Sequence, residues 1–148
     1  MADDLMKLYS ARILELAADI PHLGRLDRPQ ASVRKRSPLC GSTVTVDLTM
    51  QDGRVTALGL DVKACALGQA AAAVAGAAIP GCTRAQIERA RDELRAMLRD
   101  SGPVPAAPFA GFEVLLPARD FRNRHASILL AIEAAAEAAA LAEAAPAR

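Results

Sequence analysis

Five side chains in this sequence could bind a soft metal ion or attack a sulfur atom: Cys40, Cys65, Cys82, His22 and His125. Thiolates and imidazoles are common ligands for zinc, iron and iron–sulfur clusters, and a thiolate is also a nucleophile. The sequence contains no glycine-rich phosphate loop, no serine nucleophile elbow and no His–Glu zinc-protease helix. The chemistry to expect is therefore metal or sulfur binding through thiols.

Two of the cysteines flank a predicted β-hairpin. Residues 43–50 alternate apolar and polar side chains, which is the period of a half-buried strand. Asp52-Gly53 predicts a two-residue turn, and residues 55–62 supply the partner strand. The start of one antiparallel strand lies beside the end of the other. Cys40, before the first strand, and Cys65, after the second, are therefore expected at the same end of the sheet.

Cys65 also opens a small, apolar segment, Leu67 to Ile79, that predicts a buried helix ending at Pro80-Gly81. A helix N-terminus favours the thiolate form of a cysteine. A lone cysteine is more often a small buried hydrophobe, and we keep that interpretation for Cys82. It is disfavoured for two cysteines that converge on one sheet edge.

The two histidines are less specific. His22 lies in a turn after the first predicted helix and is interpreted as structural. His125, judged by its own neighbourhood, is a solvent-exposed residue at a helix start. Judged with the two cysteines, it is a candidate third ligand. Both interpretations of His125 stay open.

The remaining elements position these residues. We expect a helix over residues 5–20, a short edge strand within 26–35, and a helix that follows the Thr83–Gln86 capping box. A proline-rich loop, an irregular apolar stretch (112–121) and an alanine-rich helix (about 123–142) complete the chain, with disorder after about residue 142. The fold class is α+β, with a small three-stranded antiparallel sheet packed on one side by four to five helices. This two-layer sandwich forms a single domain over residues 1–148.

Composition excludes several classes of protein. The formal charge is +1, so the domain as a whole is not basic enough for a nucleic-acid binder, and with one Tyr, three Phe and no Trp we expect no base-stacking platform. The acidic N-terminus lacks the pattern of a signal peptide, and glutamates interrupt the alanine-rich tail, so we expect no membrane span and a cytoplasmic location. Three cysteines in a reducing compartment favour free thiols or metal ligands over disulfides.

Basic side chains cluster at residues 34–36 and again at Arg119, Arg122 and Arg124. Each cluster is either an ordinary solvated surface or a docking patch for an acidic protein partner. The second cluster could also hold a thiolate or persulfide anion.

The order of these features resembles the N-terminal scaffold domain of NifU-like proteins. The resemblance rests on Cys40-Gly41 entering a strand, the hairpin, and Cys65 opening an alanine-rich helix. The turn at residues 20–26 and the segment Leu116-Pro117-Ala118-Arg119 add to it, over residues 5–139 in all. It implies a binding protein and not an enzyme, on which a transient iron–sulfur cluster, or zinc in its absence, is held by three cysteines and an aspartate.

Carried over residue by residue, the resemblance makes Cys40 and Cys65 the first two ligands. Ser42 stands where the family has its aspartate, and the third cysteine has no thiol counterpart. Aligning the final helices puts His125 in its place. Two thiolates and an imidazole suit zinc, and mixed Cys/His ligation also suits iron–sulfur clusters. The metal and cofactor ligands expected are therefore Cys40, Cys65 and His125.

The function implied is iron–sulfur cluster assembly. A cysteine desulfurase would supply sulfur as a persulfide, and the cluster would pass to acceptor apo-proteins. Two alternatives stay open: a zinc-binding sulfur-transfer partner of the desulfurase, and a degenerate paralogue that has lost its site. A cluster shared between the two chains of a homodimer is also compatible with so few ligands per chain.

Overall fold

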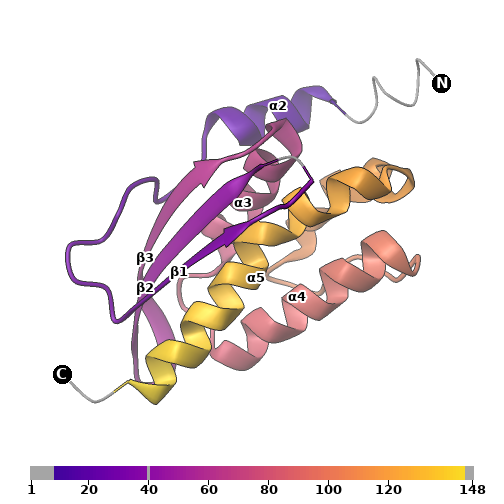
Figure 1. Cartoon of the computed structure of the whole chain (residues 1–148). Coiled ribbons are helices and arrows are strands. Elements are labelled where there is room, and N and C mark those ends of the chain that lie inside the picture. The colour runs from indigo at the N-terminus through magenta and orange to yellow at the C-terminus, as the bar shows by residue number, and fades with distance from the viewer. Residues whose placement is uncertain (1–8, 40, 146–148) are drawn as a thin grey trace.

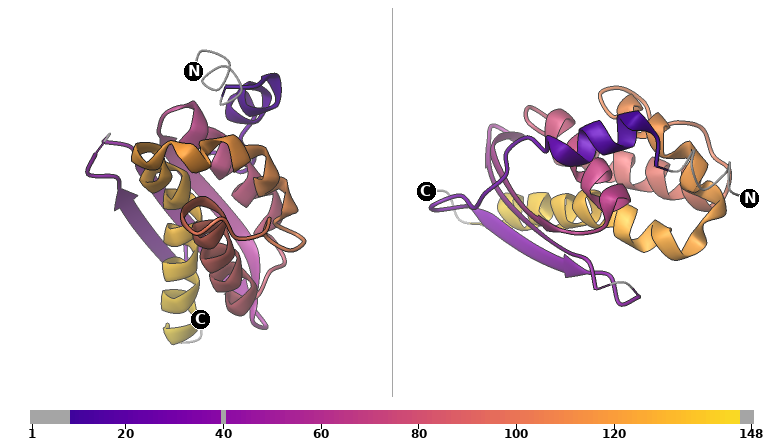
Figure 2. Two further views of the ribbon diagram at one scale, coloured as in Figure 1. Left: turned by 90° about the vertical axis from the view of Figure 1, so that its right-hand side faces the viewer. Right: turned by 90° about the horizontal axis from the view of Figure 1, so that it is seen from above.

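The computed structural model describes residues 9–39 and 41–145. The elements follow in the order α2 (Ala11–Ala18), β1 (Ala31–Arg36), β2 (Thr43–Gln51), β3 (Arg54–Lys63), α3 (Ala66–Ala78), α4 (Arg84–Arg99), the 3₁₀ helix η1 (Ala110–Asp120) and α5 (Arg122–Ala144). The predicted α+β class is confirmed. The three antiparallel strands lie in the order β1-β2-β3, and the helices pack on one side of them (Figures 1 and 2).

The hairpin forms as predicted. Asp52 and Gly53 have φ of 53° and 76°, which is the left-handed backbone that a two-residue hairpin turn requires. Beyond a register shift at Thr49/Met50, the strands pair without interruption until Thr43 lies opposite Lys63. The start of β2 and the end of β3 therefore meet at one edge of the sheet, as the predicted hairpin implied for the two cysteines that flank it.

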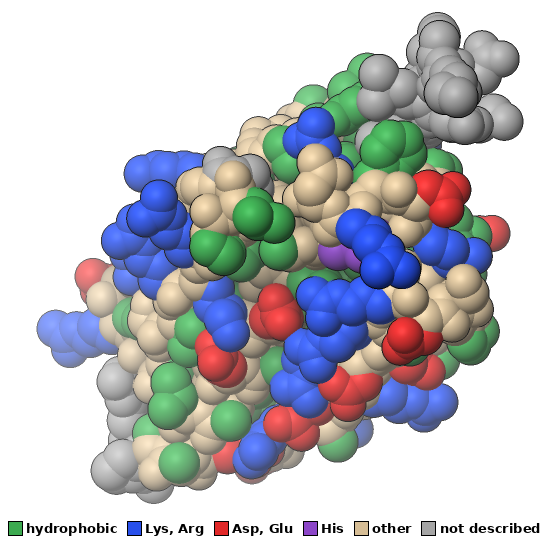
Figure 3. All heavy atoms as spheres, turned by 45° about the vertical axis from the view of Figure 1, so that its right-hand side comes forward, with side chains coloured by type: hydrophobic (Ala, Val, Ile, Leu, Met, Phe, Trp, Pro, Cys, Tyr) green, Lys and Arg blue, Asp and Glu red, His purple; other side chains and the backbone are tan. Residues whose placement is uncertain are grey.

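Aliphatic side chains from the inner face of the sheet form the core together with α3 and α5. Val44, Val46 and Leu48 of β2 are fully buried on this face, beside Leu58 and Leu60 of β3. Both α3 and α5 are rich in alanine, and such small side chains let both helices pack closely on each other and on the sheet. The α4 capping box is confirmed in both directions, between the side chain and backbone of Thr83 and Gln86. Acidic and basic side chains alternate over the helical side of the surface (Figure 3).

The outer face of the sheet is less open than predicted. The segment after α2 first pairs with the free edge of β3, where Gly24 N–H donates to the Leu60 carbonyl. It then crosses over the outer face towards β1 (Figure 1). The crossing passes directly over Gly59, where a Cβ would lie 2.6 Å from the Gly24 carbonyl oxygen. Only a glycine at position 59 leaves room for the crossing segment. Because this segment covers the outer face of the sheet, β2 is buried on both faces over most of its length.

A buried carboxylate holds the crossing segment down. Asp47, on the outer face of β2, is 0% exposed. It accepts hydrogen bonds from the Arg25 guanidinium (Nε to Oδ2, 2.6 Å), the Ser32 hydroxyl and the Leu26 N–H. Burial on its own raises the pKa of the Asp47 carboxyl, but these hydrogen bonds outweigh it and hold the pKa below its ordinary value.

Three further segments differ from the sequence prediction. The stretch expected to be irregular is the 3₁₀ helix η1, whose buried side chains Phe112, Leu115 and Ala118 recur every third residue, as three residues per turn dictate. In the described residues the first helix, expected over residues 5–20, begins at Ala11, where Ser10 caps it, and ends at Ala18; residues 1–8 lie outside the described residues. Helix α5 continues to Ala144, two residues beyond the expected end.

Helix α5 is, by length and composition alone, long and apolar enough to cross a membrane. However, 72% of its most apolar window is buried inside the protein, against β1, β2, α3 and α4. This is the pattern of the central core helix of a folded domain.

We expect Asp47→Asn to lower the free energy of unfolding by about 1.5 to 3 kcal/mol near neutral pH, the usual contribution of a hydrogen bond to a charged group. Because the native pKa of Asp47 is lowered, its carboxylate stabilises the fold fully above the unfolded-state pKa, and this is lost as the pH falls through the native pKa. Urea unfolding should therefore show the difference between the two proteins shrinking below about pH 4. A difference independent of pH would contradict the electrostatic role.

Candidate thiol site where the hairpin meets two helices

Cys65 occupies the N-cap position of α3. Its backbone is extended (φ −67°, ψ 170°), and the helix begins at the next residue. The Cys65 carbonyl accepts the first helical hydrogen bond from Gln69 N–H, and the Gln69 side chain donates back to the Ala64 carbonyl. The half-buried thiol is thus fixed at the point where β3 turns into α3, as predicted.

A pair of buried hydroxyls connects this thiol to two other elements. The Cys65 Sγ lies 3.5 Å from the Ser127 Oγ of α5. Ser127 in turn donates to the Ser42 Oγ, at 3.1 Å, immediately before β2. Both serines are more than 95% buried, so the contacts are shielded from water. The site therefore joins the start of β2, the start of α3 and the first turns of α5.

A close approach of α3 to α5 makes the contact between Cys65 and Ser127 possible. Gly68, in the first turn of α3, faces Ser127, and a Cβ there would lie 2.6 Å from the Ser127 Oγ and 2.8 Å from the Ala64 Cβ. A larger residue would push the two helices apart where the thiol meets the hydroxyl. Gly68 was missed by the sequence reasoning, which treated α3 as a uniform apolar segment.

Cys40, the second predicted ligand, lies outside the described residues. The loop around it is closed on either side, since Ser37 N–H donates to the Ser42 carbonyl (2.8 Å) and Gly41 N–H donates to the Ser37 carbonyl (3.0 Å). Gly41 has a φ of 72°, which favours glycine. The ends of the loop that contains Cys40 are therefore held at the edge of the sheet that also holds Cys65.

His125 is buried in α5, 3% exposed, so the interpretation of a solvent-exposed histidine is wrong. Its Nε2 lies 2.9 Å from the Ala118 carbonyl and 3.2 Å from that of Arg119. Since both partners are acceptors, Nε2 is the nitrogen that donates, and in the neutral ring Nδ1 then has the lone pair. A histidine that binds a metal commonly donates its other N–H to a carbonyl in this way. Coordination by His125 remains a prediction, and it concerns Nδ1.

The described residues do not by themselves complete a metal site. Within 9–39 and 41–145, no three His, Cys, Asp or Glu side chains lie close enough together to hold one metal ion. The α5 side chain placed against Cys65 is the hydroxyl of Ser127, two residues after His125. Sequence reasoning named His125 and missed Ser127, because the rotation of α5 about its axis is set by packing.

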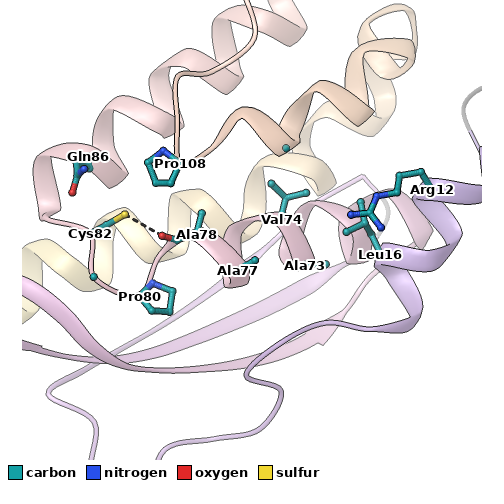
Figure 4. A pocket seen from close by; sticks show the side chains of 12 residues that line it. Arg12, Leu16, Ala73, Val74, Ala77, Ala78, Pro80, Cys82, Gln86 and Pro108 are labelled. Carbon is teal, nitrogen blue, oxygen red and sulfur yellow. Dashed lines mark hydrogen bonds between the residues drawn. The ribbon is translucent and has the colours of Figure 1, made fainter.

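A hollow of about 470 Å³ lies elsewhere and contains Cys82 (Figure 4). It is formed between α2, α3 and the start of α4. The Cys82 thiol is 3% exposed and donates to the Ala78 carbonyl, at 3.1 Å. Burial raises the pKa of Cys82, which keeps the thiol protonated and unreactive. The interpretation of Cys82 as a small buried hydrophobe is confirmed.

Two other residues singled out in the sequence are structural. His22 has a φ of 62°, and its carbonyl accepts the Leu60 N–H at the edge of the sheet. Arg119 donates from Nε to the Met97 carbonyl and from Nη2 to the Gly102 carbonyl, and so ties the end of α4 to η1. Neither residue has a partner in the thiol site among the described residues.

Solved structures of other proteins share this fold over nearly the whole chain. The N-terminal domain of a nitrogen-fixing NifU-like protein from Brucella abortus is 42% identical, with a TM-score of 0.92, and the match covers 95% of this chain and 98% of that one. Such identity over the full domain shows the family. This chain belongs to the NifU-like family, as the order of its motifs indicated.

Two more distant structures show that this NifU-like chain shares its fold with proteins of low identity. One, from Fervidobacterium islandicum AW-1, is described as an iron–sulfur cluster assembly scaffold for the SUF system: 16% identity, TM-score 0.77, 93% of this chain and 96% of that one. The other is described only as hypothetical, with 22% identity, a TM-score of 0.78, and coverage of 90% and 97%. A scan against family models finds no match, and a search of curated proteins finds none either.

We expect Gly68→Ala to lower the free energy of unfolding by about 1 to 3 kcal/mol, because the new methyl group overpacks the contact between α3 and α5. Alanine normally stabilises a helix interior relative to glycine. A loss of stability therefore distinguishes overpacking from the ordinary effect of helix propensity. The matched control is Gly111→Ala, where the new Cβ meets only the Val74 methyl groups, at 3.2 and 3.8 Å. Urea unfolding measures both, and a Gly68→Ala protein as stable as the wild type would refute the close approach.

The two described thiols should differ in reactivity. In the native metal-free protein we expect iodoacetamide to modify Cys65 at least about tenfold faster than Cys82, because Cys82 is buried and protonated. Peptide mass spectrometry after timed quenching gives both rates in one sample. The rates should converge in denaturant, and equal rates in the native protein would contradict the burial of Cys82.

Proposed function

We propose that this NifU-like chain is an iron–sulfur cluster assembly scaffold, which binds iron and sulfide transiently as its cargo and passes them on. The observation that carries the proposal is the half-buried Cys65 thiol at the junction of β3, α3 and α5, with the Cys40 loop closed at the same edge. The scaffold named in the Fervidobacterium protein, which has the same fold, supports it. A scaffold of this kind is a binding protein and not an enzyme.

The ligands we propose are the thiolates of Cys65 and Cys40 and the Nδ1 of His125. Thiolates are the usual ligands of iron–sulfur clusters, and a histidine can replace a cysteine among them. We assign Ser127 and Ser42 a different role, because neutral hydroxyls are poor ligands. The Ser127 hydroxyl can turn its proton to a thiolate or persulfide on Cys65, and buried Ser42 fixes where that hydroxyl sits.

We propose that a cysteine desulfurase delivers the sulfur. The Cys65 thiolate attacks the terminal sulfur of a persulfide on the donor, the donor S–S bond breaks, and the donor cysteine leaves as a thiolate. Cys65 then carries the persulfide, which two electrons from a reductant convert to sulfide. A cluster held by few ligands per chain leaves coordination positions that the cysteines of an acceptor apo-protein can take.

We expect protein purified without oxygen, or reconstituted with ferrous iron and sulfide, to contain iron and acid-labile sulfide together, and Cys65→Ser to lose both. Cys82→Ser is the matched control and should keep both, because Cys82 lies in the hollow away from the thiol site. Metal analysis and sulfide assay decide. Zinc without sulfide would point to a sulfur-transfer partner, and neither metal nor sulfide would refute the scaffold function.

The role of His125 needs a variant that keeps its structural hydrogen bond. His125→Gln retains an amide N–H that can reach the Ala118 carbonyl and removes the Nδ1 lone pair. If His125 is a ligand, this variant should fold like the wild type and hold less iron. If iron content and the visible spectrum of the cluster are unchanged, His125 is structural only.

A further inference from the structure

Beside the thiol site, the outer face of the sheet presents three cations from two strands. Thr43 and Thr45 of β2 lie on this face, and the register places Arg36 and Lys63 on either side of Thr43. Arg34 and Asp61 lie on either side of Thr45 in the same way. Side chains that are directly opposite across antiparallel strands share one face. We call Arg34, Arg36 and Lys63 the cationic face.

These three cations have no carboxylate partner among the described residues. The cations that stabilise the fold do have one: Arg25 binds Asp47, and Lys35, on the inner face of β1, binds Glu137. Four arginines of α4 are likewise paired with acidic residues: Arg84, Arg89, Arg91 and Arg95. The pairs of Arg25, Lys35 and Arg95 with acidic residues join different elements, whereas the charge of the cationic face is left unneutralised. Basic side chains also gather on the sheet side in Figure 3.

The cationic face is hollowed and lined with hydrogen-bond donors. A depression of about 190 Å³ is lined by Arg25, Arg34, Thr43, Thr45, Asp61 and Lys63. Asp61 is the one acidic residue among these, against Arg34 and Lys63 of the cationic face and Arg25, which is paired with Asp47. A cleft lined mainly by one sign of charge concentrates the field and attracts groups of the opposite sign. The depression has room for an anionic group such as a carboxylate.

The end of this depression at Thr43 and Lys63 lies close in sequence to the thiol site. Lys63 ends β3 two residues before Cys65, and Thr43 follows Ser42, which accepts the hydrogen bond from Ser127. A macromolecule whose acidic side chains occupy the cationic face would therefore have its body next to the thiol. Position and charge together suit a protein that exchanges sulfur, iron or a cluster with Cys65.

Nucleic acid fits this surface less well than an acidic protein. The chain carries a formal charge of only +1, so it lacks the general excess of positive charge that phosphate binding requires. The depression has no aromatic side chain on which a base could stack. Carboxylates match guanidinium and ammonium groups in geometry and charge.

We propose that the cationic face is the docking surface for an acidic segment of a partner protein that visits the thiol site. The kind of partner rests on the proposed scaffold function. The docking surface itself rests on the charge and position of the cationic face. Docking of this kind should weaken steeply with salt, because it depends on exposed charges.

The test uses the lysines as reporters, because the chain has only three: Lys7, Lys35 and Lys63. A short acetylated oligoglutamate peptide is incubated with the full-length protein and a water-soluble carbodiimide, which joins carboxylates to nearby amines. Peptide mass spectrometry locates the product. We expect coupling at Lys63 to exceed that at Lys35, which is paired with Glu137, and to disappear at about 0.5 M salt.

Two double variants make the result specific. Arg34→Glu/Arg36→Glu keeps the Lys63 reporter and should lower its coupling on the order of tenfold. Arg89→Glu/Arg91→Glu changes the net charge equally on α4 and should leave it unchanged. Coupling that is equal at Lys35 and Lys63, or that both variants reduce equally, would overturn the proposal. The proposal would also be overturned if single-stranded DNA of equal charge abolished the coupling at Lys63 when present at a lower concentration than the peptide.

Uptake of cargo separates this proposal from the scaffold function. After reconstitution with ferrous iron and sulfide, Arg34→Glu/Arg36→Glu should hold as much of both as the wild type, because the cationic face contributes no ligand. Loss of uptake in this variant would place the arginines in the cargo site and overturn the docking role. If the wild type takes up nothing, the scaffold function fails, and the coupling result still decides the docking surface.

Discussion

The register between β2 and β3 is the constraint on which the thiol site depends. The positive φ angles of Asp52 and Gly53 fix the turn, and after one register shift at Thr49/Met50 the pairing continues until Thr43 lies opposite Lys63. A slip by one residue would turn Thr45 and Asp47 into the aliphatic core and turn Val44 and Val46 to the polar outer face, where Arg25 and Ser32 lie. The hairpin therefore holds Ser42 and Cys65 side by side at an edge formed by residues far apart in sequence.

Two glycines set how closely the other elements approach this hairpin. On the inner side, Gly68 lets α5 come near enough for Ser127 to reach the Cys65 thiol. On the outer side, Gly59 lets the segment after α2 cross the sheet and place Arg25 on Asp47. In both places a missing side chain permits a polar contact, and the contact then fixes the packing. Buried hydrogen bonds of this kind tolerate little displacement, since an unsatisfied partner costs free energy.

The sequence predicts what depends on neighbouring residues. The alternation in β2, the Asp52-Gly53 turn and the Thr83–Gln86 capping box are local signals, and each element formed as expected. The period-three burial of η1 was also available in the sequence, at Phe112, Leu115 and Ala118. The rotation of α5 was not. An alanine-rich helix has no clear apolar stripe, so nothing local indicates that Ser127 faces the thiol and that His125 bonds back to η1.

The distribution of paired and unpaired charges connects the fold to the binding of partner proteins. The Asp47–Arg25 pair holds the crossing segment, and the Lys35–Glu137 pair joins β1 to α5, so these charges serve the fold and present little net field. Arg34, Arg36 and Lys63 lie on the same small sheet, are exposed, and have no such partner among the described residues. Exposed cations add little to stability. Their position beside a half-buried thiol is better explained by association, because unneutralised charge orients an acidic partner before contact. A site that must both receive and release its cargo gains from a partner held by such weak, salt-sensitive contacts.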